Sequence, residues 1–405
     1  MKRPRVLHVL TDLDSCASAR HVVDLARTLA GEFECAIACG PGVKGEASLR
    51  SYADRSAVRI LEVPSLGRRS SILADRRALR ELGDVIRSFV PAVVHTHQPK
   101  AGVLGRTAAV RARVAGTAHT FHAPLGSEGR LMISRAADER RLAKSTGRLV
   151  AVSESLRQGL VDLEIAPAAR VHVVPPLVEP AGLFTPAKPG VWRRRLTLPP
   201  EAALISFIGK LTPARDPETF VRTFAVVAAS LRDAKAVVAG AGPLRPSLEK
   251  LALRLNVAHR ITFTGWLDGV AELLADTDLL AVTSRAEGFC LPALESMAAG
   301  RPVVATRVPG VVDLVEDGRT GLLAPPGDVP TLAGAAIILL RDAAYRGRLA
   351  AAAREEAWRK FSGADAAAPM AALYTAMARR EARGDRADAA GKRGRSERSS
   401  RLREP

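Results

Sequence analysis

The stretch from Arg285 to Gly300 reads R-A-E-G-F-C-L-P-A-L-E-S-M-A-A-G. It follows an apolar run over residues 278–283 and precedes another over residues 302–306, as the loop and helix of a β-α-β unit do. Proline suits the first position of a helix and glycine suits its end, so Pro292 and Gly300 should bound a helix of about two turns. The stretch therefore predicts a parallel sheet with this loop at the carboxyl end of a strand.

Two glutamates lie in this stretch, Glu287 in the loop and Glu295 in the helix. Ligands of open parallel sheets bind outside the carboxyl ends of the strands, and the N-terminus of a helix favours anions. Carboxylates and free amides together can hold sugar hydroxyls and a phosphate. The amides expected to be free are those of Gly288, Phe289, Cys290 and Leu291.

This pair of glutamates resembles the signature of the family-4 retaining glycosyltransferases of the GT-B fold, and the stretch from His95 to Ala109 resembles the members that assemble polysaccharides. Seven residues separate the pair, and the surrounding sequence E-G-F-C-L-P-A-L-E-S-M-A-A-G-R-P-V-V-A-T-R-V-P-G-V-V-D-L-V-E-D-G-R-T-G-L-L is more specific than that spacing. The resemblance implies two facing Rossmann-like, doubly wound α/β domains with a central cleft, and C-terminal helices that cross back to the first domain. In the alternative interpretation, Glu295 only interacts with the helix dipole and Glu287 is a solvated loop residue.

Short apolar runs alternate with helical patterns along the chain, as in parallel β-α-β units. The strands expected in the first half are Val6 to Leu10, Cys35 to Ala38, Val58 to Val63, Ala92 to His95, Ala118 to Phe121, Leu149 to Val152 and Val171 to Val174. Those expected in the second half are Leu204 to Ile208, Ala236 to Ala239, Ile261 to Thr264, Leu279 to Thr283, Val303 to Thr306 and Leu322 to Ala324. The expected helices are His21 to Leu29, Ser71 to Phe89, Lys100 to Val114, Ser153 to Leu163, Pro217 to Leu231, Leu244 to Leu255, Val270 to Leu274, Pro292 to Ala299 and an Ala-rich region after Gly327.

A Pro-rich segment over residues 173–190 breaks the alternation and is interpreted as a linker between domains. The chain is then predicted to consist of four parts. They are an N-terminal, acceptor-side Rossmann-like domain (1–180), a C-terminal, nucleotide-sugar-binding Rossmann-like domain (181–362), a helix returning to the first domain (363–383) and a basic disordered tail (384–405).

The composition fits a globular protein of two domains, with 405 residues and 47% hydrophobic residues. No apolar run of about 18 residues and no signal peptide are found, and the four cysteines lack metal-ligand spacing, so a cytoplasmic protein is expected. The net charge is +18. Anionic lipid, nucleotide phosphate and nucleic acid would all be attracted, so the charge selects no partner.

The resemblance implies roles for residues on the donor side. Glu295 would hold the ribose hydroxyls of the donor and Glu287 the hydroxyls of its sugar. Lys210 and Arg215 stand where the family has arginine and then lysine, so both charges are present with the residue types exchanged. They would neutralise charge on the departing diphosphate, although two surface cations are the alternative interpretation. The nucleotide pocket is expected to include Gly209, Gly240, Gly242 and Pro243.

Residues of the first half are expected on the acceptor side. His122, in A-H-T-F-H-A-P-L-G, matches a cleft histidine of the family that positions the transferred sugar. Cys16 and Ala17 stand where the family usually has two glycines, which leaves the contact between this loop and the donor diphosphate open. Lys100 and Arg106 are interpreted either as phosphate or acceptor contacts or as part of a solvated helix face.

Two further groups of residues have less specific patterns. His95 and His97 alternate at a strand end like metal ligands, but a pair of hydrogen-bonded imidazoles is the preferred interpretation. The acids of residues 308–321 are expected to cap helices and turns.

The sequence thus predicts a glycosyltransferase that moves a hexosyl or N-acetylhexosaminyl group from a nucleoside diphosphate sugar to an acceptor with retention of configuration. The expected acceptor is a saccharide, for example a lipid-linked one in polysaccharide synthesis, with an anionic membrane surface as a further partner. No metal, no other cofactor and no specific nucleic acid are expected. The alternatives are a catalytically degenerate GT-B regulatory protein and a polyanion-binding protein acting through its basic tail; the motifs of a sugar-nucleotide 2-epimerase are not found.

Overall fold

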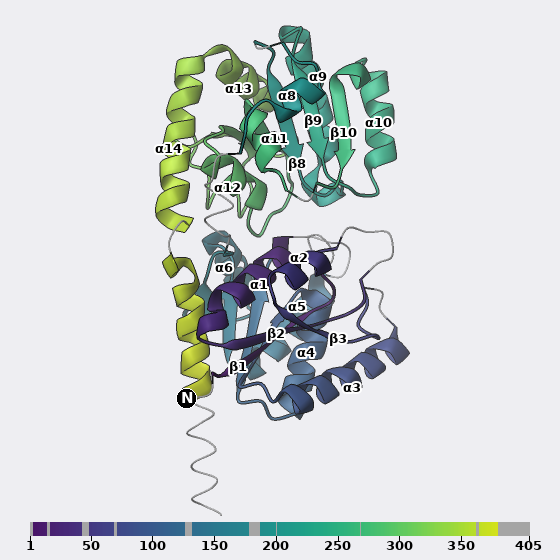
Figure 1. Cartoon of the computed structure of the whole chain (residues 1–405), viewed down its shortest axis with the longest axis vertical. Helices are drawn as coiled ribbons and strands as arrows, with labels where there is room; N and C mark the ends of the chain where they lie inside the picture. Colours follow the sequence, from purple (N-terminus) through teal and green to yellow (C-terminus); the bar gives the residue numbers. More distant parts are fainter. Residues whose placement is uncertain are drawn as a thin grey trace, which may run out of the picture.

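The computed structural model describes residues 3–13, 17–42, 48–68, 71–125, 132–177, 187–199, 201–267, 269–361 and 364–379. These residues form two α/β lobes stacked along the long axis of the molecule (Figure 1). The strands of the first lobe are β1 (Arg5–Leu10), β2 (Glu34–Cys39), β3 (Arg59–Glu62), β4 (Val93–His97), β5 (Gly116–Phe121), β6 (Arg148–Ala151) and β7 (Val171–Val173). Those of the second are β8 (Leu204–Ile208), β9 (Lys235–Ala239), β10 (Ile261–Gly265), β11 (Leu279–Val282), β12 (Val303–Thr306) and β13 (Leu322–Ala324).

Each lobe contains one parallel sheet. The strand order is β3-β2-β1-β4-β5-β6-β7 in the first lobe and β10-β9-β8-β11-β12-β13 in the second. Central strands such as β8 and β11 are buried on both faces, which explains their nearly continuous apolar sequences. All expected strands are present, and their ends differ from the expected ones by no more than two residues.

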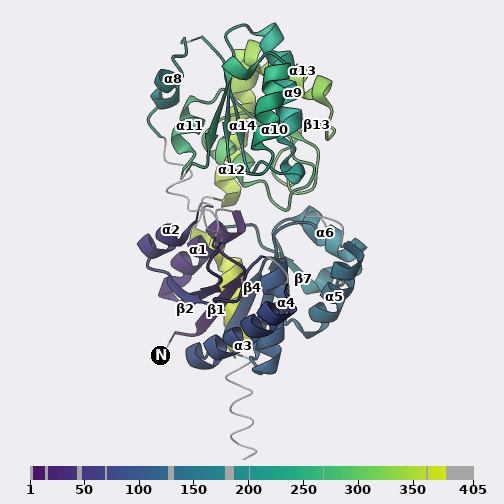
Figure 2. The ribbon, with the colours of Figure 1, turned by 90° about the vertical axis from the view of Figure 1, so that its right-hand side faces the viewer.

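Helices pack against the sheets (Figures 1 and 2). They are α1 (Ala17–Thr28), α2 (Arg50–Arg55), α3 (Ile72–Phe89), α4 (Pro99–Arg111), α5 (Met132–Ser145), α6 (Glu154–Asp162), α8 (Val191–Arg195), α9 (Pro217–Ser230), α10 (Arg245–Arg254), α11 (Ala271–Asp276), α12 (Leu291–Ala298), α13 (Val329–Arg341) and α14 (Ala343–Phe361). Three of them, α2, α5 and α8, were not expected. Helix α5 has the polar sequence M-I-S-R-A-A-D-E-R-R-L-A-K-S, which lacks the apolar stripe that identifies a helix.

The C-terminal part of the chain returns to the first lobe, as expected. Residues 368–379 are helical and run along that lobe, in yellow in Figures 1 and 2. Tyr374 is fully buried there, in a cluster with Leu25 and Phe33 of the N-terminal lobe. The Phe33 ring meets the Tyr374 ring edge-on, with centroids 5.5 Å apart. The basic tail lies outside the described residues, as does half of the expected linker.

The two lobes touch at the loops that follow their strands. A Cβ atom on Gly288 would lie 2.0 Å from the carbonyl oxygen of His122, so only glycine fits at this contact. Asp313 of the second lobe accepts a hydrogen bond from the amide of Ser155, at the N-terminus of α6 in the first lobe (3.0 Å). Asp313 thus caps a helix across the boundary, which confirms the expected capping for this one acid of its segment.

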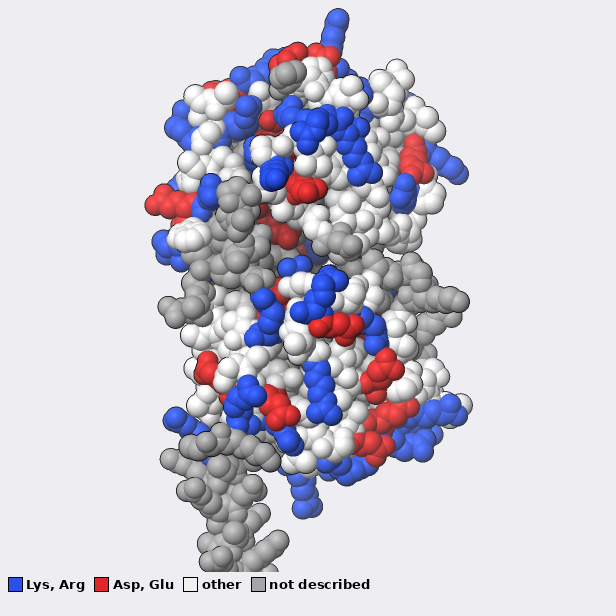
Figure 3. Space-filling model, viewed as in Figure 1, with Lys and Arg blue, Asp and Glu red and all other residues white. Residues whose placement is uncertain are grey.

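Charged residues cover both lobes. On the face in Figure 3, blue and red side chains are interspersed and no single patch collects the positive charge. Within the described part of the chain, no helix has both the length and the apolar character needed to cross a membrane.

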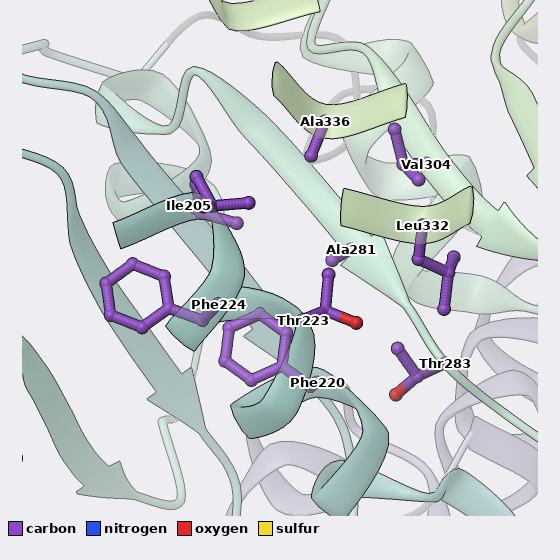
Figure 4. Close-up of a pocket in the computed structure, with 10 residues that line it drawn as sticks. Ile205, Phe220, Thr223, Phe224, Ala281, Thr283, Val304, Leu332 and Ala336 are labelled. Atoms are coloured by element: carbon purple, nitrogen blue, oxygen red, sulfur yellow. The ribbon is translucent and has the colours of Figure 1, made fainter. Parts of the chain in front are cut away.

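A small cavity of about 10 Å³ lies in the core of the C-terminal lobe (Figure 4). Its lining is apolar except for Thr223 of α9 and Thr283 after β11. This volume has room for about one water molecule, and no charged side chain lines it. The cavity is therefore a feature of core packing and not a ligand site.

The two threonines of this cavity are expected to respond oppositely to replacement by valine. Thr223 Oγ1 is buried without a partner in the described residues, whereas Thr283 Oγ1 donates to the carbonyl oxygen of Asp216 (2.8 Å). A buried hydroxyl without a partner costs about 1–3 kcal/mol, so Thr223→Val should raise the free energy of unfolding by about 1 kcal/mol. Thr283→Val should lower it by about 1 kcal/mol. Urea denaturation of both variants tests this, and a destabilised Thr223→Val would contradict it.

Candidate functional site

Glu287 forms an ion pair with Arg215. It lies in the loop between β11 and α12 and is only 3% exposed, so the interpretation as a solvated residue is wrong. Its carboxylate accepts a hydrogen bond from Ser284 Oγ (2.8 Å) and contacts the guanidinium of Arg215. Burial lowers the pKa of Arg215, but an arginine remains charged at physiological pH. The residues expected to hold the donor sugar and its diphosphate therefore meet at one point.

A short turn holds Arg215 in this place. Residues Pro213–Arg215 form one turn of 3₁₀ helix, and Asp216 follows with a φ of 43°. Asp216 accepts from the amide of Thr219 (3.3 Å) and so caps α9, and it also accepts from Arg285 Nε (2.8 Å). Sequence analysis missed Asp216, although aspartate before the first proline of a helix is a capping signal.

Glu295 lies on α12 and faces a cation of the other lobe. Burial raises the pKa of this carboxyl to about 7, and the nearby charge of Arg20 on α1 partly opposes the rise. Arg20 is held by Asp24 (Nε to Oδ2, 3.0 Å) and lies over the ring of Tyr52, 4.1 Å from its centroid. Sequence analysis missed Arg20 because the proximity of two residues 275 positions apart leaves no local signal.

The amides before α12 are partly available. Those of Gly288, Phe289 and Cys290 donate to no group in the described chain, whereas Leu291 donates to the carbonyl of Phe289 (3.2 Å). The expectation of a free amide is therefore wrong for Leu291. The side chains of Phe289 and Cys290 are buried in the core, and burial raises the pKa of the Cys290 thiol. Cys290 is thus not an activated thiol, and both residues face a ligand only through their backbone.

The loops after β8 and β9 are in backbone contact. A Cβ atom on Gly240 would lie 1.8 Å from the carbonyl oxygen of Gly209, and one on Gly242 would lie 2.4 Å from that of Leu211. The residues expected to line the nucleotide pocket, which include the exposed Pro243, are therefore neighbours. Lys210 is half-buried beside them and has no partner among the described side chains, so its ammonium group is available to an anion.

His122 belongs to a row of hydrogen-bonded imidazoles. Its Nε2 lies 3.0 Å from Nδ1 of His97, whose Nε2 lies 3.1 Å from Nδ1 of His8. His95 uses Nδ1 for the hydroxyl of Tyr374 (2.6 Å) and Nε2 for a threonine hydroxyl. The expected hydrogen bonding of His95 and His97 is confirmed. Burial lowers the pKa of all four histidines, so they are neutral at pH 7.

His8, His95 and His97 lie close enough together to suggest a metal site. Both ring nitrogens of His95 and of His97 already have hydrogen-bond partners in the protein. A metal ion would have to displace several of these bonds, so these nitrogens are satisfied without one. The expectation that no metal is required stays a prediction.

Two residues that were predicted to contact a phosphate or the acceptor form ion pairs within the protein instead. Arg106 is 1% exposed and donates to both carboxylate oxygens of Glu139 on α5 (2.7 Å each). Both interpretations of Arg106, as a ligand contact and as part of a solvated face, are therefore wrong, because the residue links α4 to α5. Lys100 pairs with Asp75 of α3 (2.7 Å). Ala17 begins α1, and Cys16 lies outside the described residues.

Two family models match this chain. One, described as Glycosyltransferase Family 4, covers residues 18–181, and the other, described as Glycosyl transferases group 1, covers residues 202–342. Together they include both lobes and most residues of the site.

Curated relatives agree with these models. The chain is 35% identical over 271 residues to a D-inositol 3-phosphate glycosyltransferase of Stackebrandtia nassauensis, which covers 64% of this chain and 61% of the relative. It is 33% identical over 312 residues to a protein of the same name from Xylanimonas cellulosilytica, with 72% and 73% covered. The chain thus spans about three fifths of the length of the former relative and about three quarters of the latter.

A solved structure supports the fold. HepE of Anabaena, in complex with UDP and glucose, superposes with a TM-score of 0.78 at 18% identity, covering 91% of this chain and 99% of HepE. At this identity the likeness concerns the fold alone. With the family models and the relative from Xylanimonas, it follows that the chain belongs to the family-4 glycosyltransferases and that its lobes have the GT-B fold.

Proposed function

We propose that this protein transfers a sugar from a nucleoside diphosphate sugar to a hydroxyl acceptor with retention of configuration. The observation that carries the proposal is the group formed where the lobes meet. Two carboxylates, Glu287 and Glu295, lie there with the cation of Arg215 and with the open amides of Gly288 to Cys290. This is the set of charges and donors that a sugar, a ribose and a diphosphate require together.

Each group has a role in this reaction. Glu295 would accept hydrogen bonds from the ribose hydroxyls and Glu287 from hydroxyls of the sugar. The bond between the anomeric carbon and the diphosphate oxygen breaks, and Lys210 and Arg215 stabilise the charge left on the diphosphate. The acceptor oxygen forms its bond on the face that the diphosphate leaves, and its proton goes to the departing phosphate oxygen. When the donor binds, Arg215 would lose its contact to Glu287 and contact the donor instead.

The donor and acceptor are proposed by class. Because HepE was solved with UDP, a uridine diphosphate hexose or N-acetylhexosamine is the first donor to test. Both relatives are named D-inositol 3-phosphate glycosyltransferase, so D-inositol 3-phosphate is one acceptor to test. The sequence pattern favours a lipid-linked saccharide, which is the other. Transfer assays with each acceptor separate the two. Binding to an anionic membrane remains a prediction, which requires co-sedimentation with anionic vesicles at low salt.

Nucleotide binding should stabilise the protein selectively. UDP, GDP, ADP and TDP are compared by thermal shift, in enough salt to suppress nonspecific phosphate binding. A ligand at about 100 times its dissociation constant should add about 2.7 kcal/mol to the free energy of unfolding. The gain should disappear in Glu295→Gln and persist in Glu249→Gln, a matched change at an exposed residue of α10. No shift with any nucleotide would reject the proposal and favour the regulatory or polyanion-binding alternatives.

The same Glu295→Gln variant should be more stable than the wild type when no nucleotide is present. Because burial raises the pKa of Glu295 from 4.5 to about 7, the native state holds its proton more tightly than the unfolded state. Native stability then falls as the pH rises from about 4.5 to 7, and glutamine removes this loss. The variant should gain about 3 kcal/mol at pH 8 and about 2 kcal/mol at pH 6. Urea denaturation at both pH values measures the difference, and equal gains would contradict it.

A further inference from the structure

Three histidines form a row that ends where the two lobes meet. The histidine row consists of His8 on β1, His97 at the end of β4 and His122 just after β5, and these strands are neighbours in the sheet. Consecutive members are joined by hydrogen bonds of 3.1 and 3.0 Å. His8 and His97 are fully buried, whereas His122 is partly exposed. The row thus connects the interior of the sheet to the proposed site.

Neutral imidazoles in such a row can carry their protons in only two consistent ways, because each ring has one donor and one acceptor nitrogen. In the first, His8 donates from Nδ1 to His97 and His97 donates from Nδ1 to His122. In the second, His122 donates from Nε2 to His97 and His97 donates from Nε2 to His8. In both arrangements Nδ1 of His122 remains for a ligand contact, and they differ in whether that nitrogen carries a proton.

The inner end of the row distinguishes the two arrangements. Nε2 of His8 is buried without a partner among the described residues. In the first arrangement this atom is an unprotonated acceptor, and in the second it is an N–H donor. An N–H group buried without an acceptor is the rarer and costlier of these defects. The structure therefore favours the first arrangement.

We propose that His8 and His97 are positioning residues that fix His122 as the tautomer with its proton on Nδ1. Nε2 of His122 is already occupied by His97, so Nδ1 is the only ring nitrogen that a ligand can reach. His122 then acts as a hydrogen-bond donor toward an oxygen atom of the bound sugar or phosphate, a role that rests on the proposed function. Burial supports this arrangement because it lowers the pKa of all three histidines and keeps them neutral.

A neighbouring histidine provides an internal reference. His21 accepts a hydrogen bond at Nδ1 from the amide of Leu177 (2.8 Å), so its own proton must lie on Nε2. Its ring lies 5.7 Å from that of His122. Two adjacent histidines are therefore expected to show opposite tautomers in the same protein.

The tautomers are measured by long-range ¹H–¹⁵N NMR of the full chain labelled with ¹⁵N-histidine, with the signal of His122 assigned by its loss in His122→Gln. Wild-type His122 should show the Nδ1–H pattern and His21 the Nε2–H pattern. His8→Leu removes the donor and should give His122 a mixture of tautomers. His8→Asn places an amide N–H near the former Nδ1 and should restore the single tautomer. His119→Asn, which changes a buried histidine outside the row, should leave His122 unchanged.

An Nε2–H pattern for wild-type His122 would overturn the proposal, even if His8→Leu failed to fold. An unchanged tautomer in a folded His8→Leu variant would overturn the role of His8. UDP-glucose is then added as a probe. A shift of the Nδ1 signal of His122 supports its contact with the donor, whereas saturation binding without a shift rejects that contact and leaves the tautomer result standing. Failure of UDP-glucose to bind counts against this donor in the proposed function and not against the histidine row.

Discussion

Replacing Arg215 with alanine is expected to lower kcat for sugar transfer by about 100- to 1,000-fold, the loss typical of removing one preorganised group that stabilises transition-state charge. Arg215 contacts Glu287 beside the open amides before α12 and lies five positions after the half-buried Lys210 in the sequence. The charge on the departing diphosphate grows as the reaction proceeds, so a fixed cation stabilises the transition state more than the bound donor. The loss should therefore appear mainly in kcat and only weakly in the KM for the donor.

A second variant separates chemistry from folding. Arg215→Ala leaves the carboxylate of Glu287 buried with Ser284 as its one hydrogen-bond partner among the described residues, which should cost up to about 3 kcal/mol of stability. The double variant Arg215→Ala with Glu287→Gln removes this unpaired charge, so it should recover stability without recovering activity. Arg215→Lys keeps the charge but loses the planar fork and should lose about 10-fold in kcat. Full activity of Arg215→Ala would contradict the assigned role.

The fold could be predicted because its signals are local. Most strands are apolar runs between polar turns, and in central strands such as β8 and β11 burial on both faces keeps that run nearly continuous. Helix α5 escaped prediction because much of its surface is polar. Its attachment depends on Glu139, which reaches Arg106 on another helix. A contact of this kind has no signature in either helix alone.

The site could be predicted only in part, for the same reason. The motifs identified Glu287 and Arg215 as donor-binding residues, but nothing in the sequence indicates that they contact each other from loops 72 residues apart. His122 was identified because A-H-T-F-H-A-P-L-G matches a motif of the family. Its partners His97 and His8 depend on the order in which β1, β4 and β5 lie in the sheet. A motif therefore identifies which residues belong to the site, whereas the order of the strands determines which of these residues contact each other.

Acid is expected to unfold this protein between about pH 5 and 6, because five histidines are buried in neutral form. They are His8, His21, His95, His97 and His119, each no more than 3% exposed. Burial lowers the pKa of His8 to about 3 and that of His21 to about 4, and it lowers the pKa of the other three well below 6.5. Above pH 6.5 these histidines are neutral in both states and do not reduce the free energy of unfolding. Below pH 6.5 the free energy of unfolding falls, because the unfolded chain binds protons that the buried histidines of the native state do not bind.

The size of this effect follows from the number of histidines. Each histidine lowers the free energy of unfolding by about 1.4 kcal/mol for every pH unit below 6.5, so five lower it by about 7 kcal/mol per unit. The total free energy of unfolding of a typical domain is about 5–15 kcal/mol. Glu295, with its raised pKa, opposes this by about 2 kcal/mol at most. Circular dichroism during urea denaturation at pH 7.0, 6.0 and 5.5 gives the slope. His119→Asn, which keeps a polar group near Thr96, should reduce the slope by about 1.4 kcal/mol per unit. A wild-type protein that keeps its full stability at pH 5 would show that these histidines are protonated in the native state.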